Sequence, residues 1–327
     1  MPGQPAVSVR YYRPSDEEAV LRVIQASFAP WPAFDIGVAP IDHLRWKIEC
    51  APDPEATHMV AEANGQIVGI RLCLVRDYSN NGARVTVRTD TDNAVLPEWR
   101  GRGVNAAIGD SVFESSPAEL ILSSTREPSL IRRDQDLGHR PLRNRFVSAS
   151  SLLSQSFPGA AAMSVSEIAR FDERIMKLWT LAVQPYEFIL APSVNWLNWR
   201  FCDQRGGNGF VLQTEENTDV TGFIVARTSR GKGHIAYLLA LPGRGDVIQP
   251  LIAACMTRLR DAGVAEAICT LPEHHPYRET LLALGFTHKR RRIPVTTRLR
   301  RTGDPERPFR HDPYARIHLM LGDFDFI

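Results

Sequence analysis

The residues best suited to binding a ligand lie in segment 95–105, where Gly101 and Gly103 alternate with arginines. A strand-like run, 85–95, precedes these glycines, and a run with helical character, 106–113, follows them, so they fall in a turn at the start of a helix. Such a turn presents unpaired backbone N–H groups, and the helix dipole adds partial positive charge there. Because glycine has no Cβ, a ligand can approach the backbone closely. The sequence therefore predicts a cradle for a pyrophosphate.

A dinucleotide-binding fold is one possible owner of this cradle, because Gly101, Gly103 and Ala106 satisfy the fingerprint G-x-G-x-x-G/A. That fingerprint requires a buried apolar strand directly before the first glycine and an acidic residue about 20 positions later. Here residues 89–93 are polar, and Ile121 stands at the acidic position. A phosphate-loop NTPase is excluded because no Lys-Ser/Thr follows the glycines. Both nucleotide-binding folds are therefore rejected.

The segment instead resembles the acyl-CoA-binding signature of the GNAT acetyltransferase family, V-x-P-x-x-R-G-x-G-x-G/A. The match departs at its last position, where Asn105 replaces glycine or alanine. The resemblance implies that backbone amides of residues 100–105 hold the pyrophosphate of an acyl-CoA co-substrate, acetyl-CoA or another, and that the preceding strand pairs with the pantetheine arm. The alternative is an arginine-rich surface turn. The expected cofactor-binding residues are Val95, Leu96, Arg100, Gly101, Arg102, Gly103, Val104, Asn105 and, on a later strand, Ser123.

Acyl transfer from a thioester to an amine needs a base, a donor for the oxyanion and an exit for the thiolate. The resemblance implies direct attack by the amine without a covalent enzyme intermediate, and no Gly-x-Ser-x-Gly elbow opposes this. A backbone N–H near Val95 or Leu96 is the expected oxyanion donor.

Carboxylates on the strands before the cradle are the candidate bases. Asp90 and Asp92 are two residues apart on one strand, so they are expected to share a face. Asp92 is nearer the expected thioester and is the first candidate, and Glu62 on the preceding strand is the second. For either residue, an exposed carboxylate without a catalytic role is an equal alternative, and a water chain is another.

The leaving-group acid is not defined by the sequence. Many family members carry a tyrosine four residues before the glycine of a Leu-Gly pair, where this chain has Asp134, and Glu127 stands at a frequent asparagine position. These departures suggest catalysis by positioning, or a residue from the second half such as Tyr237 or Tyr277. Ser123 is expected to hydrogen-bond the pantetheine.

Two tryptophan motifs indicate an internal repeat. Residues 44–47 read Leu-Arg-Trp-Lys and residues 197–200 read Leu-Asn-Trp-Arg. A glycine in a strand-like stretch follows each tryptophan at the same distance, Gly69 and Gly222. Each tryptophan is expected to be a core anchor rather than a ligand-stacking residue.

Further pairs occur in the same order. Ser15 and Ser164 each begin a Ser-x-x-Glu capping box that predicts a helix start, and Gly138 and Gly285 each end a Leu-Gly pair. Four coincidences in one order argue for duplication.

The predicted fold class is α/β (α+β), with two tandem GNAT-like domains, each a mixed, mostly antiparallel sheet flanked by helices. The expected domains are 1–150, with the acyl-CoA-binding loop, and 151–327, a degenerate copy, joined by a Ser-, Ala- and Gly-rich connector at 148–163. In the second copy the cradle position reads Leu-Pro-Gly-Arg-Gly-Asp at 241–246, and its aspartate would repel an anion. The apolar C-terminus, 319–327, is expected to dock on a domain or a partner.

Composition limits the remaining possibilities. The net charge of +2 is too small to indicate nucleic acid or an anionic membrane as a partner. Five cysteines show no framework spacing, and no Cys-x-x-Cys or paired Cys/His motif indicates a metal. Neither an apolar signal core nor an apolar run long enough to cross a membrane occurs, so a cytoplasmic protein is expected.

The sequence thus predicts an acyl-CoA-dependent N-acyltransferase, most simply an N-acetyltransferase, acting on the amine of a small molecule, an amino sugar or a peptide. One alternative is an enzyme that transfers long-chain or carrier-protein-bound acyl groups. Another is a non-catalytic protein that binds CoA or a partner; the missing tyrosine and asparagine favour it, and the cradle opposes it. The oligomeric state is not indicated.

Overall fold

The computed structural model describes residues 6–52, 57–125, 128–153, 163–300 and 308–324. Among them, nine strands form the first sheet, in the order β1–β2–β3–β4–β5–β15–β6, with β9 paired to β3 and β16 paired to β9. The pairs β4–β5 and β9–β16 are parallel and the other pairs are antiparallel. The strands are β1 (Ser8–Tyr11), β2 (Met59–Ala63), β3 (Gln66–Asn80), β4 (Ala83–Val95), β5 (Leu120–Ser123), β6 (Arg140–Pro141), β9 (Phe188–Leu190), β15 (Thr296–Leu299) and β16 (Ile317–His318).

A second sheet has seven strands within the same described ranges, in the order β14–β7–β13–β12–β11–β10–β8. Its β12–β13 pair is parallel, as β4–β5 is in the first sheet. The strands are β7 (Phe146–Leu152), β8 (Val165–Ile168), β10 (Gly209–Glu216), β11 (Asp219–Ser229), β12 (Lys232–Ala240), β13 (Glu266–Pro272) and β14 (Thr287–Ile293).

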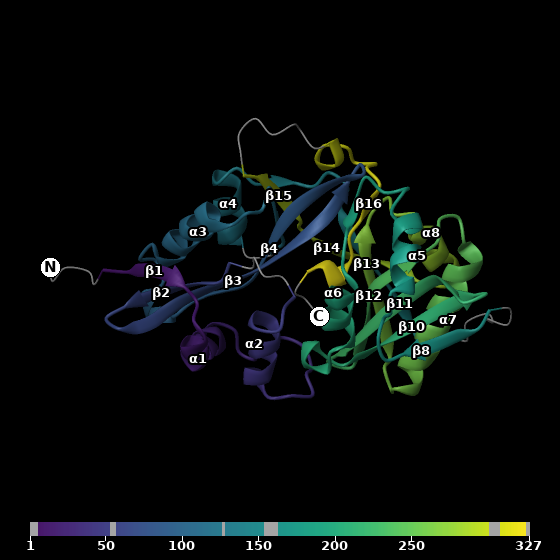
Figure 1. The fold of residues 1–327 in the computed structure, drawn as a ribbon, viewed down its shortest axis with the longest axis horizontal. Helices are drawn as coiled ribbons and strands as arrows, with labels where there is room; N and C mark the ends of the chain where they lie inside the picture. The colour runs from purple at the N-terminus through teal and green to yellow at the C-terminus, as the bar shows by residue number, and fades with distance from the viewer. Residues whose placement is uncertain (1–5, 53–56, 126–127, 154–162, 301–307, 325–327) are drawn as a thin grey trace.

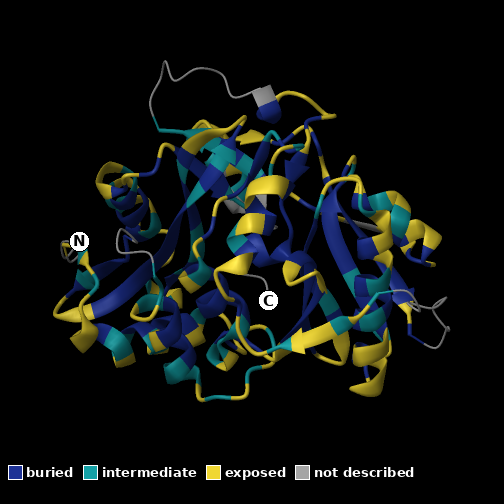
Figure 2. Cartoon of the chain, turned by 45° about the vertical axis from the view of Figure 1, so that its right-hand side comes forward, coloured by how far each residue is buried: buried dark blue, intermediate teal, exposed yellow. Residues whose placement is uncertain are grey.

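Helices cover the sheets, and buried residues follow the strands while exposed residues lie on the outer sides of the helices (Figure 2). In the first half, α1 and α2 pack on one face of the sheet and α3 packs on the other (Figure 1). No described helix is both long and apolar enough to cross a membrane. The helices are α1 (Glu17–Ser27), α2 (Pro40–Ile48), α3 (Val104–Ser115), α4 (Pro128–Asp136), α5 (Arg174–Ala182), α6 (Val194–Leu197), α7 (Gly245–Asp261) and α8 (Tyr277–Ala283).

The two halves exchange one strand each. β7 follows β6 in the chain but lies between β13 and β14 in the second sheet, and β15 follows β14 but lies between β5 and β6 in the first. Figure 1 shows the yellow β15 among the blue and teal elements of the first half. Each sheet is therefore completed by the other half, and the sheets do not divide the chain at residue 150.

This exchange corrects the predicted connector, because residues 148–152 belong to β7. The serine-rich composition suggested a loop, but buried hydroxyls find partners inside the sheet. For example, Ser148 Oγ lies 2.9 Å from Thr270 Oγ1 on β13. Residues 154–162 of the predicted connector lie outside the described residues.

The duplication is visible at the tryptophans. The Trp46 and Trp199 rings stack with centroids 4.7 Å apart, and each indole Nε1–H donates to the other's carbonyl, at 3.1 and 2.9 Å. A Cβ on Gly69 would collide with α3, and one on Gly222 would collide with α7, so both glycines permit close helix packing. The prediction that the tryptophans are core anchors is confirmed.

One predicted helix start is wrong. Residues 165–168, expected to follow the capping box at Ser164, form the edge strand β8, and α5 begins only at Arg174. β8 pairs antiparallel with β10 as β1 pairs with β2, so the second half also opens with a strand. The helix expected after Ser15 is confirmed as α1.

The exchange predicts that residues 1–150 will not fold alone, because without β15 the sheet edge of β5 is unpaired. We expect this fragment to be insoluble or unfolded by circular dichroism. Co-expression with residues 151–327, which supply β15, should restore a soluble complex. A fragment that folds cooperatively by itself would contradict the exchange.

The tryptophan pair predicts a large stability loss on truncation. Trp46→Ala removes a side chain that is 1% exposed, so the free energy of unfolding should fall by about 3–5 kcal/mol, measured by urea denaturation. Tyr11→Ala, at a position 58% exposed, is the control and should cost less than about 1 kcal/mol. Equal losses would mean that the pair does not anchor the fold.

Candidate functional site

The predicted cradle is a turn that ends at the first residue of α3. Gly103 is the N-cap of this helix, and both Gly101 and Gly103 have positive φ, 74° and 79°. A Cβ at either glycine would meet nothing within 4 Å, so the space above the turn is open. In the described part of the chain, no backbone carbonyl accepts from the amides of Gly101, Arg102 or Gly103. The turn thus presents N–H groups to solvent at the positive end of a helix.

Local contacts hold this turn in place. The backbone N–H of Trp99 donates to Leu96 O at 2.9 Å, and Arg100 Nε donates to Val95 O at 3.1 Å. The Arg102 guanidinium lies over the Trp99 ring, 5.3 Å from its centroid. The arginine side chains therefore fix the turn to the end of β4, which leaves the backbone to meet a ligand.

The strands β4 and β5 separate beside this turn. Their parallel pairing ends at Thr89 and Leu122, whereas β4 continues to Val95. Leu96 N donates to a β3 carbonyl at 2.9 Å. In an antiparallel pair the backbone N–H groups of one strand point alternately toward and away from the partner strand, so this bond fixes the directions of the preceding amides of β4. The amides of Asn93 and Val95 therefore point away from β3, toward the side that β5 has left. We call this opening the first cleft.

The second sheet has the same opening, the second cleft, where β12 parts from β13 beyond the pair Ile235–Cys269. The amides that correspond to those of the first cleft belong to Leu238 and Ala240, because Gly222 pairs with Ala240 as Gly69 pairs with Val95. Here both amides are bonded: Leu238 N donates to Met320 Sδ at 3.2 Å and Ala240 N to Tyr277 Oη at 3.1 Å.

The C-terminal segment fills the second cleft. Arg200 donates to the carbonyls of Gly322 and Phe324, at 3.1 and 2.6 Å, and residues 317–324 are buried. The expected docking of the C-terminus is confirmed for residues 319–324, and residues 325–327 lie outside the described residues. Tyr237 is buried in the same region, with its ring centroid 5.1 Å from that of His318.

The second copy's loop also differs from the cradle. Gly243 keeps a positive φ of 75°, but Asp246 stands in the first turn of α7, where Arg244 binds it at 2.7 Å. Arg244 also binds Glu216 at 3.1 Å. A negatively charged side chain thus already stands in the first turn of this helix, beside the place where an anion would bind.

A β-bulge corrects the expected placement of two candidate bases. Arg71 pairs with Asn93 and Cys73 with Asp90, so β4 has one residue more than β3 in this interval. The extra residue reverses the alternation of side chains. Asp90 and Asp92 consequently face opposite sides of the sheet, and the expectation that they share a face is wrong.

Asp92 lies on the side covered by α1 and α2, and it is 8% exposed. Its Oδ1 accepts from Trp31 Nε1 at 2.8 Å and its Oδ2 from Lys47 Nζ at 2.6 Å. Glu62 is on β2, beyond β3, and its Oε2 accepts from Arg10 Nε at 3.0 Å. Each candidate base is therefore engaged in an ion pair.

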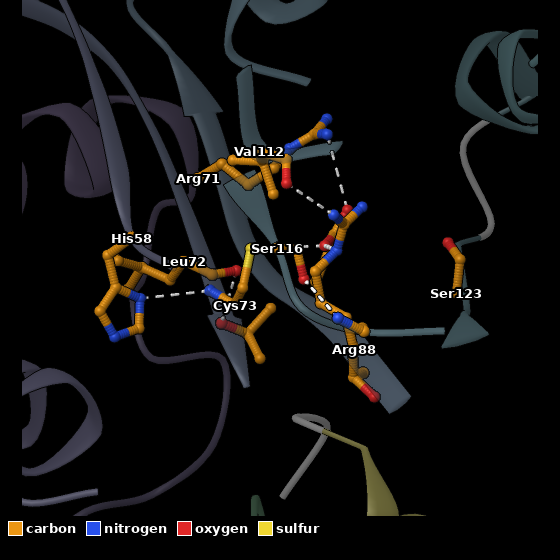
Figure 3. Close-up of polar contacts among 12 residues, drawn as sticks. His58, Arg71, Leu72, Cys73, Arg88, Val112, Ser116 and Ser123 are labelled. Atoms are coloured by element: carbon orange, nitrogen blue, oxygen red, sulfur yellow. Dashed lines mark hydrogen bonds and ion pairs between the residues drawn. The ribbon is translucent and has the colours of Figure 1, made fainter. Parts of the chain in front are cut away.

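Asp90 faces α3 and lies between Arg71 and Arg88, two arginines that Figure 3 labels. Arg88 Nε is 2.9 Å from Asp90 Oδ1, and Arg71 Nη1 is 3.6 Å from Asp90 Oδ2. The arginines also reach α3: Arg88 Nη1 donates to Val112 O at 3.1 Å and Arg71 Nη2 to Asn105 Oδ1 at 3.0 Å. Burial alone would raise the pKa of Asp90, but the two guanidinium groups outweigh it and hold the pKa below its usual value.

Two neighbouring groups belong to the same layer. Cys73 Sγ is 3.4 Å from Asp90 Oδ1, and burial holds the pKa of its thiol well above the usual range. Cys73 N donates to His58 Nδ1 at 3.2 Å, and Figure 3 shows His58 on the far side of Cys73 from the arginine head groups. Sequence reasoning missed Arg71, Arg88 and Cys73, although charged residues within apolar strands were a usable signal.

The opposite wall of the first cleft comes from β5 and α4. Ser123, at the end of β5 and apart from the arginines in Figure 3, donates to Asp134 Oδ2 at 3.2 Å. His139 follows α4, and its Nδ1 lies 3.3 Å from Thr296 Oγ1. Burial, together with Arg298, lowers the pKa of His139 to about 4, so its ring is neutral at pH 7. Glu127, at the family's asparagine position, lies outside the described residues.

The described residues also form a cavity away from the cradle. This cavity of about 560 Å³ lies near the far end of β4 from the cradle, lined by Asp77, Arg84 and Thr86 of the first half and Ser193 and Trp196 of the second. No group of three or more His, Cys, Asp or Glu side chains within the described ranges could hold a metal ion.

Comparisons with known proteins identify the fold. No protein-family model and no curated protein sequence matches the chain. A GCN5-related N-acetyltransferase structure from Kribbella flavida matches with a TM-score of 0.68 and 18% identity, over 90% of this chain and 71% of that one. A GCN5-related N-acetyltransferase from Anabaena variabilis gives 0.67 and 12%, over 90% and 73%.

A third structure matches the arrangement of both halves. It is a tandem GNAT protein from the clavulanic acid biosynthesis pathway, with a TM-score of 0.62 and 13% identity, and the match covers 91% of this chain and all of that one (100%). At such identities the likeness concerns the fold. The predicted architecture of two mixed, mostly antiparallel sheets flanked by helices is confirmed, and the chain has the tandem GNAT fold.

Proposed function

We propose that the protein is an acyl-CoA-dependent N-acyltransferase that uses the first cleft. The observation that carries this proposal is the difference between the two clefts. In the second, the edge amides of β12 are bonded to the protein's own side chains, and a carboxylate occupies the helix start. In the first, the amides of Asn93 and Val95 face the opening, and a Cβ on Gly101 or Gly103 would meet nothing within 4 Å.

An acyl-CoA fits the first cleft by its chemistry. The pyrophosphate would accept hydrogen bonds from the amides of residues 100–105, and the amide groups of the pantetheine would pair with the edge of β4 as a strand does. Ser123 would bond the pantetheine from the opposite wall. Acetyl-CoA is the simplest donor, and a longer acyl group is the variant to compare with it.

The reaction we propose is direct attack of a neutral amine on the thioester carbonyl beside the bulge. Leu96 N is already bonded to β3 and the amide of Val95 lies nearer the cradle, so the oxyanion donor would be the amide of Asn93. Asp92 and Glu62 remain candidates for the base, but each would have to release its cationic partner. We therefore favour water as the first acceptor of the amine proton.

The acceptor class we propose is a small-molecule, amino-sugar or peptide amine, approaching from the α1 and α2 side of the sheet. A cytoplasmic protein without nucleic-acid or membrane partners is consistent with the composition. Residues 1–150 would supply the acyl-CoA contacts. The second domain would complete the first sheet and contribute to the acceptor pocket.

A non-catalytic CoA-binding protein is the second candidate, because Asp134 stands where the family's tyrosine would act as an acid. Thermal unfolding with acetyl-CoA, a longer acyl-CoA, free CoA and NADH separates these possibilities. At 100 times its dissociation constant a ligand adds about 2.7 kcal/mol of stability, which corresponds to a shift of a few degrees. Turnover with an amine panel supports the enzyme, stabilisation by CoA without turnover supports the second candidate, and stabilisation by NADH alone refutes both.

The cradle assignment predicts that Gly103→Glu abolishes CoA binding, because the new carboxylate would stand where the pyrophosphate is expected. The dissociation constant, measured by calorimetry, should rise at least about 100-fold. Gly243→Glu is the matched control, since Gly243 also has a positive φ and open space in the second copy. Its strain cost should be similar, with unchanged CoA affinity. Equal effects of the two substitutions would refute the assignment.

A further inference from the structure

The charged groups on the β3–β4 wall of the first cleft do not balance. Arg71 and Arg88 are 8% and 3% exposed, and a single carboxylate, that of Asp90, lies between them. His139 is neutral at pH 7 and Cys73 remains a thiol, so neither changes this sum. These five groups therefore hold one net positive charge in a buried place. An uncompensated buried charge is costly, so a fold without a use for it would not be expected to retain it.

The charges on the opposite wall are closer to solvent. Arg298 of β15 interacts electrostatically with Arg88 across the cleft and with Asp110 and Asp134, which are exposed and half-buried. Solvent screens such charges far more than it screens the buried arginines. The excess positive charge thus belongs to the β3–β4 wall.

Its position along β4 corresponds to the reacting end of an acyl-CoA. At about 3.3 Å per strand residue, Asp90 lies roughly 15 Å before Val95, a length comparable to an extended pantetheine arm. β4 and β5 rejoin at the next residue, Thr89, so the thioester end of an arm that follows β4 from the cradle is confined between Asn93, which pairs with Arg71, and Asp90. The sulfur is therefore expected at the level of the two arginines.

The second copy is an internal control. The registers of the equivalent strand pairs, together with the Leu-Gly pairs, give each of these five polar residues an equivalent position in the second domain. Every equivalent is apolar or glycine, so the duplicated fold does not require the charges. The charged residues occur only in the first copy, whereas the cleft of the second copy is filled by the C-terminal segment. The replacements are Arg71 by Ile224, Cys73 by Ala226, Arg88 by Gly233, Asp90 by Ile235 and His139 by Phe286.

We propose that Arg88, supported by Arg71, stabilises the negative charge that develops on the CoA sulfur, in place of a side-chain proton donor. This inference rests on the proposed function. The amine nitrogen bonds to the carbonyl carbon, the C–S bond breaks with its electron pair on sulfur, and the amine proton leaves to water. CoA then departs as a thiolate held in a positive field, which accounts for an enzyme with Asp134 at the tyrosine position.

The direct test is the pKa of the CoA thiol in the bound state, followed by ultraviolet thiolate absorbance. The complex with desulfo-CoA provides the baseline, which removes the signal of the protein's own cysteines. One net charge a few ångströms away in a medium of intermediate dielectric should lower the thiol pKa by about two units relative to free CoA. An unchanged thiol pKa in a CoA complex that forms normally would overturn the inference and leave the proposed function intact. Failure of CoA to bind would instead refute the proposed function.

Substitutions of these residues are expected to shift the pKa of the bound CoA thiol in opposite directions. General damage to the fold would not produce such a pattern. Arg88→Met should raise the bound thiol pKa toward that of free CoA and lower kcat about 100-fold with little change in KM. Arg88→Lys keeps the charge and should retain most of the shift. Asp90→Asn removes the compensating carboxylate, so the thiol pKa should fall further. A rise in Asp90→Asn, or equal pKa values for Arg88→Met and Arg88→Lys, would refute the role of the charge.

Discussion

A backbone N–H that leaves a sheet must find another acceptor. The departure of β5 from β4, and of β13 from β12, creates such groups at the same place in each half. The second half satisfies them with Met320 and Tyr277. The first half leaves them facing an opening beside a glycine turn at a helix start. The site that we propose in the first half thus corresponds to a place that the second half fills with its own side chains.

The second domain is nevertheless necessary to the first. β15 lies between β5 and β6, so the wall of the first cleft that carries Ser123 depends on a strand from the other half. The reciprocal Trp46–Trp199 hydrogen bonds join the same halves at α2. A degenerate copy that had lost its own ligand would therefore be retained, because removing it would leave the first sheet incomplete.

The parts of this structure that the sequence predicted are those with local causes. Gly101 and Gly103 have the positive φ values that favour glycine, and α3 follows them directly, so the glycine turn and the helix start were readable from the sequence. The strand exchange was not, because it depends on pairing between residues far apart in the chain. A single extra residue in β4 likewise reversed the side of Asp92, and no local pattern marks such a bulge.

The arginines show how a duplicated fold separates stability from function. Burying Arg88 beside α3 costs free energy, and the equivalent position in the second copy is Gly233, which has no side chain to bury. A Cβ on Gly233 would collide with Leu259 of α7, so the second domain packs its helix directly on the strand there. The first domain instead holds α3 through the Arg88–Val112 hydrogen bond and keeps a charge beside the cleft. The packing that one copy gains is therefore what the other gives up to hold a buried cation beside the first cleft.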